Sequence, residues 1–134
     1  MPEKKLLHAE LTQEIIGAYY RVYNTLGYGF VEKVYHHAMI IELLSRGLSL
    51  KSEQPITVYY QQIPIGTYYA DLVVENKIIL ELKAAQYVSD AHLAQLTNYL
   101  SATDMELGLL LNFGKQAKFV RRVLLNSRKK AFGG

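Results

Sequence analysis

Residues 69–83 read YADLVVENKIILELK, in which two apolar runs stand on either side of a short polar break at Glu75-Asn76-Lys77. Each run has the length and apolar character of a strand, and the break is short enough to be the loop of an antiparallel hairpin. Charged residues interrupt the apolar runs at Asp71, Glu81 and Lys83. The stretch therefore predicts a two-stranded ribbon that carries a polar patch.

The register of this hairpin decides whether the charged groups meet. Residues two apart in a strand point to the same face, so Glu81 and Lys83 share a face. A three-residue loop places Val74 opposite Ile78 and Asp71 opposite Glu81, with facing Cβ atoms roughly 5 Å apart. A two-residue loop would turn Asp71 to the other face. We therefore predict a three-residue loop and a divalent-metal site formed by two carboxylates, with a lysine beside it.

The composition predicts one folded domain spanning residues 1–134. Half of the residues are apolar, which is typical of a globular protein, and the absence of cysteine excludes disulfides and thiolate metal sites. The apolar runs are much shorter than the ~18 residues of a membrane span. The N-terminus lacks the apolar segment of a signal peptide. These features predict a cytoplasmic protein without a membrane partner.

The spacing of apolar residues predicts an α-α-β-β-β-α-β-β order. We expect helices over residues 8–24, 31–46 and 90–102, and strands over 56–60, 67–74, 77–84, 106–112 and 119–125, with a turn over 61–66. The first three strands form an antiparallel meander. On the second helix the inward stripe is predicted to contain Val31, Val34, Ala38, Ile41 and Leu43 or Leu44.

Two helices offer further candidate site residues. On the third helix His92, Gln95 and Tyr99 form a polar stripe. Taken alone, such a stripe favours a helix surface that faces water; the alternative is that Gln95 reaches the metal patch. On the second helix Glu32 and Tyr35 are three residues apart. A carboxylate in the first turn is favoured by the helix dipole alone, so Glu32 also has a purely structural explanation. Three histidines, His8, His36 and His37, are assigned no role.

The basic residues are concentrated at the C-terminal end. From Lys115 onward the chain has seven Lys or Arg residues and no acidic residue. Such a segment suits a polyanion, because each neutralised phosphate releases counterions. We take Lys115, Lys118, Arg121 and Arg122 as candidate nucleic-acid contacts. Residues 127–134 are expected to form a flexible basic tail, for which a solvated end without function is the alternative.

These pieces together resemble a known family. Asp71 followed by Glu81-Leu82-Lys83 is similar to the motif of the PD-(D/E)XK nuclease superfamily, with Ala70 at the motif's proline position. The segment Gln95-Leu96-Thr97-Asn98-Tyr99 resembles the QxxxY element of its RecB-like members, and Gly29 to Tyr35 resembles the signature of the GxxExxY family. Further agreement lies at Glu53-Gln54, Gly108 to Gly114 and Phe119 to Val123, and one departure is Tyr28, where the family often has proline.

The resemblance implies a restriction-endonuclease-like α/β (α+β) core, in which helices flank a mixed sheet of four to five strands. It also implies a Mg²⁺-dependent nuclease, with Mn²⁺ as a substitute ion and DNA as the expected substrate. Asp71, Glu81 and the Leu82 carbonyl would hold the metal, and Glu32 a metal-bound water or a second ion. Lys83 and Gln95 would act on water or phosphate, and Tyr35 and Tyr99 would support them.

Two other interpretations remain open from the sequence. A nucleic-acid-binding or interaction module could keep the same fold without turnover, although the intact motif residues favour an enzyme. A metal-binding structural protein would need carboxylates that are closed to substrate. A chain this small also offers no element that reads sequence, so a homodimer or a protein partner is a further expectation.

Overall fold

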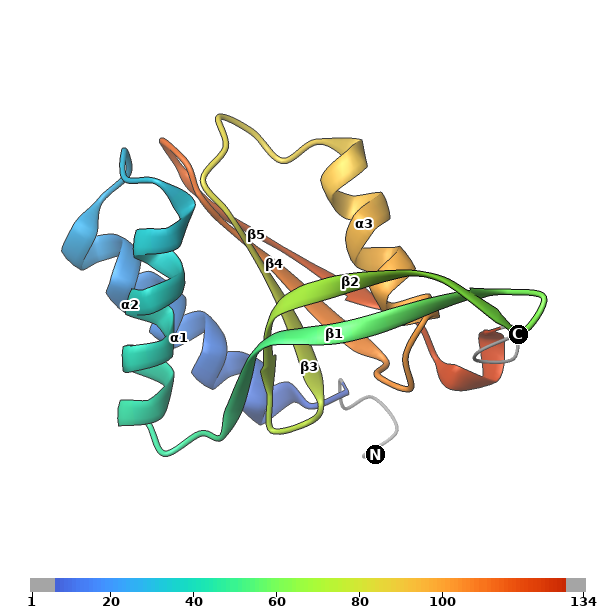
Figure 1. Cartoon of the computed structure of the whole chain (residues 1–134). Coiled ribbons are helices and arrows are strands. Elements are labelled where there is room, and N and C mark those ends of the chain that lie inside the picture. Colours follow the sequence, from blue (N-terminus) through green and yellow to red (C-terminus); the bar gives the residue numbers. More distant parts are fainter. Residues whose placement is uncertain (1–6, 130–134) are drawn as a thin grey trace.

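The computed structural model describes residues 7–129 and contains one five-stranded sheet with helices on both faces (Figure 1). The elements in chain order are α1 (Ala9–Leu26), α2 (Glu32–Ser45), β1 (Leu50–Tyr60), β2 (Ile63–Val74), β3 (Ile78–Lys83), α3 (Asp90–Ser101), β4 (Leu107–Phe113), β5 (Ala117–Val123) and a 3₁₀ turn at Asn126–Arg128. The predicted order of helices and strands is confirmed. Between residues 7 and 129 no helix has the length and apolarity needed to cross a membrane.

The sheet is mixed, as expected. Its strands lie in the order β1-β2-β3-β4-β5, and each neighbouring pair is antiparallel except β3 and β4, which are parallel. A parallel pair needs a long crossover, which α3 supplies here. All seven residues of β4 are buried, as predicted for a central strand covered on both faces.

The first hairpin differs from its predicted form. We expected a turn over residues 61–66, but only Gln61 and Gln62 separate the strands, and Pro64 lies within β2. β2 pairs with β3 only over residues 72–74, so the outer half of β2 has β1 on one side alone. A proline without an N–H is tolerated there because no ladder bond is needed on the open side. Pro55 is likewise accommodated in the edge strand β1.

Helices α1 and α2 cover one face of the sheet. Helix α1 buries a stripe that includes Ile15, Ala18, Tyr19 and Val22. On α2 the predicted stripe holds only in part, since Leu43 is buried and Ala38 packs against the core. Tyr35 and Met39 are buried as well, whereas other predicted members point outward. Ile41, for example, is 69% exposed. Helix α2 is apolar on most sides, so residue spacing alone does not single out the face that packs.

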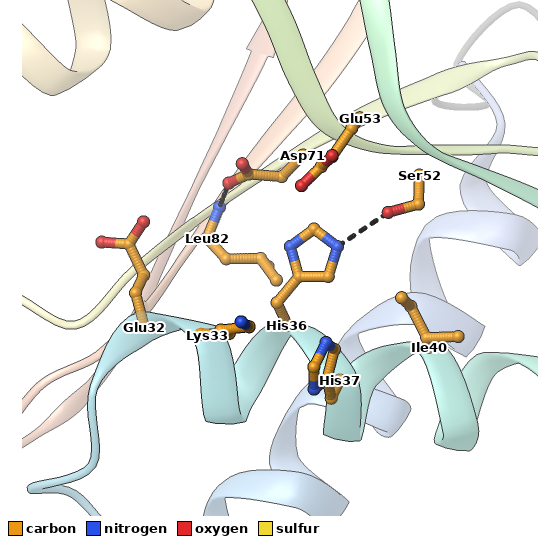
Figure 2. A pocket seen from close by; sticks show the side chains of 9 residues that line it. All are labelled: Glu32, Lys33, His36, His37, Ile40, Ser52, Glu53, Asp71 and Leu82. Atoms are coloured by element: carbon orange, nitrogen blue, oxygen red, sulfur yellow. Dashed lines mark hydrogen bonds between the residues drawn. The ribbon is translucent and has the colours of Figure 1, made fainter.

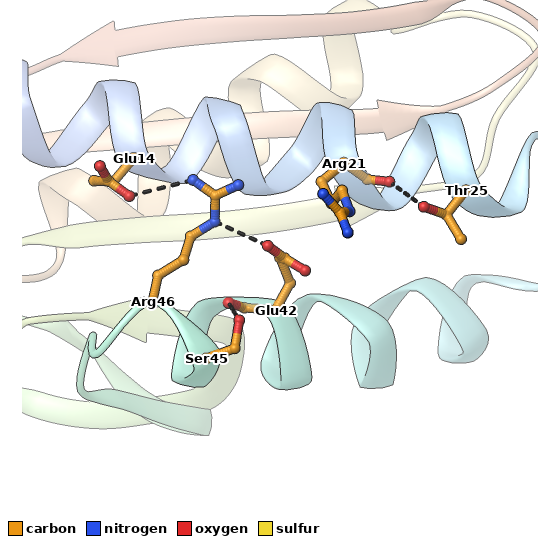
Figure 3. A network of polar contacts seen from close by, with 6 residues as sticks. All are labelled: Glu14, Arg21, Thr25, Glu42, Ser45 and Arg46. Carbon is orange, nitrogen blue, oxygen red and sulfur yellow. Dashed lines mark hydrogen bonds and ion pairs between the residues drawn. The ribbon is translucent and has the colours of Figure 1, made fainter.

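Arg46 joins these two helices at their exposed side (Figure 3). Its guanidinium lies 2.9 Å from Glu42 of α2 and 3.2 Å from Glu14 of α1. These hydrogen bonds, the Glu42 one first, raise the already high pKa of Arg46. Gly47 follows with a φ of 79°, the left-handed conformation in which helices commonly end.

Helix α3 covers the other face and forms a second core. Leu96 and Leu100 pack there with Ile79 and Leu110. A Cβ added at Gly108 would lie 2.6 Å from Leu96, so glycine at this position permits the helix to approach the sheet closely. Ser89 caps the helix by accepting from the His92 N–H, and the His92 ring accepts from the Ser89 N–H in return. His92, a member of the predicted polar stripe, therefore serves this cap.

Candidate functional site

The loop between β2 and β3 has the predicted length. Val74 pairs with Ile78 and Leu72 with Leu80, which leaves three loop residues, 75–77. The Lys77 N–H closes the loop on the Val74 carbonyl at 3.0 Å. The predicted register is therefore confirmed.

Beyond the Leu72–Leu80 pair, side chains replace the backbone ladder. The Asp71 N–H donates to Glu81 Oε2 at 3.1 Å, and the Leu82 N–H donates to Asp71 Oδ2 at 2.8 Å. Each carboxylate thus bridges to the backbone of the neighbouring strand. The structure brings Asp71 and Glu81 together at the point where β2 and β3 separate.

Burial makes this carboxylate pair costly when both groups are ionised. Glu81 is only 3% exposed, and burial, together with the nearby Asp71 charge, raises its pKa to about 8. Burial also raises the pKa of Asp71, against the opposing effect of the Leu82 N–H. The ion pairs found within residues 7–129 both involve Arg46, so neither carboxylate has a cationic partner at that distance. A shared proton or a bound cation would relieve the repulsion.

The donors at this pair fit a hard divalent cation. The described residues contain no group of three or more His, Cys, Asp or Glu side chains that could hold a metal, so the donors at this point are the two carboxylates and the backbone oxygens beside them. The N–H and C=O of one strand residue point to the same neighbouring strand, and the Leu82 N–H points at Asp71. The Leu82 carbonyl therefore faces the same gap. Mg²⁺ accepts such a small set of oxygen ligands because it keeps several waters.

Lys83 and Gln95 lie on the α3 side of the pair. The Lys83 ammonium donates to Gln95 Oε1 at 3.2 Å, so the predicted reach of Gln95 from α3 brings it to the lysine. Tyr99 is buried in the α3 core beside the Tyr68 ring. It therefore does not face water, as the water-facing interpretation of the stripe requires. Burial first, and then the charges of Glu81 and Asp71, raises the pKa of Tyr99 to about 12.

A cleft of about 580 Å³ opens on the α2 side of the pair (Figure 2). Asp71 and Leu82 form its wall on the sheet, and Glu32 lines it from the first turn of α2. The charge of Glu32 is among those that raise the pKa of Glu81. Glu32 nevertheless does not join Asp71 and Glu81 in a three-carboxylate metal group.

This acidic cleft includes two residues to which sequence analysis gave no role in the site. Glu53 lies next to the Asp71 position across β1 and β2 and has a φ of 52°, a conformation unusual for a residue other than glycine. His36 enters from α2, where its Nε2 is 2.9 Å from Ser52 Oγ (Figure 2). Its spacing of four residues from Glu32 was the available signal, because such residues share a helix face.

Tyr35 holds the turn that precedes α2 and is not part of the Asp71–Glu81 pair. Its hydroxyl donates to the Gly27 carbonyl at 2.6 Å and accepts from the Phe30 N–H at 3.2 Å. Its ring stacks on Phe113, with centroids 4.3 Å apart. Tyr35 thereby ties the turn before Glu32 to the core of the sheet.

Asn112 holds the chain where β3 ends, a role that sequence analysis missed. Its side chain accepts from the Ala85 N–H at 2.9 Å and donates to the Ala85 carbonyl at 3.0 Å. A Cβ at Gly114 would lie 2.3 Å from the same carbonyl, so this position also requires glycine. A lone polar residue in the apolar run of β4 was the signal, since a buried amide needs partners.

The candidate basic residues do not form one surface. Along β5, Phe119 packs with the α1–α2 core and Val120 with the α3 core, so alternation places Lys118 and Arg122 on the α3 face. Arg121 points to the opposite face, where it donates to the Leu7 carbonyl at 3.1 Å.

Lys118 lies in the same cross-strand row as Lys83. Lys83 pairs with Asn112, and Asn112 pairs with Lys118. Two strand spacings of ~4.8 Å place the two lysine backbones roughly 10 Å apart on the same face. The C-terminal segment is described only as far as Lys129, whose ammonium donates to the Thr103 and Met105 carbonyls. The flexible tail over 127–134 stays a prediction, and 130–134 lie outside the described residues.

Comparison with known proteins agrees with this geometry. A family model described as the PD-(D/E)XK nuclease superfamily matches residues 9–123, which include every element from α1 to β5. Neither a curated protein nor a solved structure matches the chain. The matched range contains Asp71, Glu81, Lys83 and Gln95 in one continuous fold.

Proposed function

The chain belongs to the PD-(D/E)XK nuclease superfamily, and on that premise we propose that it is a Mg²⁺-dependent nuclease that hydrolyses phosphodiester bonds of DNA. The observation that carries the proposal is the buried Asp71–Glu81 pair, which lacks a cationic partner at ion-pair distance and has Lys83 on the strand beside it. The GxxExxY spacing of Gly29, Glu32 and Tyr35 further supports membership of that family within the superfamily.

In this proposal, Asp71, Glu81 and the Leu82 carbonyl hold the metal. When bound, a divalent cation lowers the pKa of water and polarises the scissile phosphate. The hydrogen bonds that Asp71 and Glu81 accept from the backbone fix the direction of each carboxylate before the ion arrives. Such preorganisation reduces the reorganisation needed during reaction.

Lys83 stabilises the negative charge that develops on the phosphate and orients the attacking water. Its hydrogen bond to Gln95 holds the ammonium in place without neutralising it, because an amide is uncharged. Tyr99 supports the pair from the α3 core. Glu32 acts from the cleft through water or a second ion, since it is exposed and lies apart from the two ligands.

Lys118 is the strongest of the proposed phosphate contacts, because it is exposed on the same face as Lys83. Lys115 and Arg122 are secondary contacts. We expect Lys118→Ala to reduce the slope of log K against log salt concentration by about one, because one phosphate contact is lost.

A cleavage assay tests the function. Wild type, Glu81→Ala and Lys83→Ala are incubated with single-stranded, linear, branched and supercoiled DNA and with RNA, in Mg²⁺, Mn²⁺ or EDTA. Lys77→Ala serves as the matched control, because Lys77 is an exposed lysine of the neighbouring loop. We expect metal-dependent cutting that is lost in both site variants and retained in the control.

Absence of cutting by the wild type on every substrate would contradict the nuclease and favour a binding module. Equal cutting by Lys83→Ala and wild type would refute the role of Lys83. Cleavage of RNA alone would support the nuclease activity and show that the substrate is RNA and not DNA.

A further inference from the structure

A second cavity of about 340 Å³ lies beside the acidic cleft. We call it the aromatic pocket, and the residues that matter in its lining are Tyr28, Phe30, Ala84, Ala85, Phe113 and Lys115. Its size is that of a small-ligand site, which is typically ~300–1,000 Å³. No carboxylate lines it, whereas Glu32, Glu53 and Asp71 line the acidic cleft. The two cavities therefore suit groups of different chemistry.

Two segments of the chain connect the aromatic pocket to the proposed site. Phe30 stands two residues before Glu32, and Ala84 directly follows Lys83. One residue of extended chain spans roughly 3.3 Å. The pocket therefore lies within one or two residues of Glu32 and Lys83 along the chain.

Two of the aromatic rings that line the pocket are exposed although the turn that carries them is fixed. Tyr28 is 57% exposed and Phe30 49%. The Phe30 N–H donates to the Tyr35 hydroxyl, and the Phe30 ring meets the Tyr35 ring edge-on at 6.1 Å. Gly29 has a φ of 113°, which a residue with a side chain rarely adopts. Packing in the core therefore does not explain why these rings are presented to solvent.

We propose that the aromatic pocket binds an unpaired nucleobase next to the scissile phosphate, an inference that rests on the proposed nuclease function. The base stacks on Tyr28 and Phe30, and Lys115 contacts the phosphate that follows it. Stacking tolerates any base because every base has a π face. A base inside a duplex is already stacked and paired, so it has to leave the helix first. The substrate class is accordingly single-stranded, frayed or branched nucleic acid.

Binding of a base-free polymer provides the test. Fluorescence anisotropy compares a labelled oligothymidine with an abasic oligomer of equal length and charge, with Ca²⁺ in place of Mg²⁺ to prevent cutting; oligouridine forms a parallel arm for RNA. The wild type is expected to prefer the base-bearing oligomer by about tenfold or more. Tyr28→Ala and Phe30→Ala should reduce this preference severalfold, and Tyr28→Phe should keep it because the ring remains. Tyr60→Ala, which removes an exposed tyrosine from β1, is the matched control.

The results separate this inference from the nuclease proposal. A preference that is lost in Tyr28→Ala supports the pocket, even if the wild type cuts no substrate and the nuclease proposal fails. If the wild type cuts its substrate but Tyr28→Ala shows the same base preference as the wild type, the proposed base-binding role of the pocket is overturned and the nuclease proposal stands. Equal loss of preference in the Tyr60→Ala control also overturns it.

Discussion

Two clusters of charge in this molecule are built in opposite ways. On the outside of α1 and α2, Glu14 and Glu42 share the guanidinium of Arg46 in an exposed site. At the junction of β2 and β3, Asp71 and Glu81 lie together in a largely buried site without a cation at ion-pair distance. The first pair of carboxylates is neutralised by the protein, and the second is not.

The difference shows where the fold retains an unfavourable arrangement. Exposed ion pairs contribute ~0–1 kcal/mol, so the Arg46 cluster is a minor brace. Two buried carboxylates cost stability when both are ionised, and such perturbed groups concentrate at functional sites. Stability alone does not explain Asp71 and Glu81, whereas the proposed divalent cation between them would balance their charges.

The largest difference is expected between Lys83, which lies beside the buried carboxylates, and Lys118, which lies outside the site. Lys83→Met should lower kcat roughly 10²–10³-fold, the size expected for losing one group that stabilises the transition state. Lys118→Ala should change KM a fewfold and the salt dependence of binding, with kcat retained. Steady-state cleavage at two salt concentrations measures both. A similar loss of kcat in the two variants would contradict the distinction.

Asn112 tests whether the end of β3 is held independently of the carboxylates. Asn112→Ala removes both hydrogen bonds to Ala85 and leaves that backbone unpaired, so we expect a loss of about 1–3 kcal/mol in the free energy of unfolding. Urea denaturation measures this loss of stability, and Asn98→Ala, which changes an exposed residue of α3, is the control. Equal stability of Asn112→Ala and wild type would show that the ladder alone fixes this end.

The pH dependence of stability also distinguishes the Asp71–Glu81 cluster from the Arg46 cluster. The pKa of Glu81 is raised to about 8 in the fold, so between pH ~5 and ~8 the native state keeps a proton that the unfolded chain releases. Stability of the metal-free protein should therefore fall as pH rises through that window. Glu81→Gln should flatten the dependence and make the protein more stable than wild type at pH 8. Unfolding curves in EDTA at several pH values give both numbers, and an equally steep fall in Glu81→Gln would assign the dependence elsewhere.

Arg46 should give the smallest effect. Arg46→Ala removes two exposed ion pairs, and we expect a loss of at most about 1 kcal/mol that shrinks further at high salt. Denaturation at low and high salt is sufficient to measure it. A loss of several kcal/mol would mean that the α1–α2 cluster is a main support of the fold.

Much of the site could be predicted because strand geometry is strict. The three-residue loop at 75–77 follows from requiring Asp71 and Glu81 on one face, and the observed register has that form. The family resemblance, rather than the spacing of Gln95 alone, assigned Gln95 to the site, where its hydrogen-bond partner is Lys83.

The remaining features depend on contacts between distant segments. Helix α2 is apolar on most sides, so only the sheet beneath it decides that Tyr35 packs inward. The link between Asn112 and Ala85 joins residues that are far apart in the sequence and has no local pattern. Glu53 becomes a neighbour of Asp71 only once β1 and β2 are in register.

The most direct measurement of the central claim is the effect of Mg²⁺ on thermal unfolding at pH 8. Wild type, Asp71→Asn and the surface control Glu42→Gln are melted in EDTA and in Mg²⁺. At a free concentration 100 times Kd, binding to the native state adds about 2.7 kcal/mol of stability. We expect that gain in wild type and Glu42→Gln and its loss in Asp71→Asn. The same Mg²⁺ stabilisation in Asp71→Asn and wild type would show that the buried carboxylates are not the metal site.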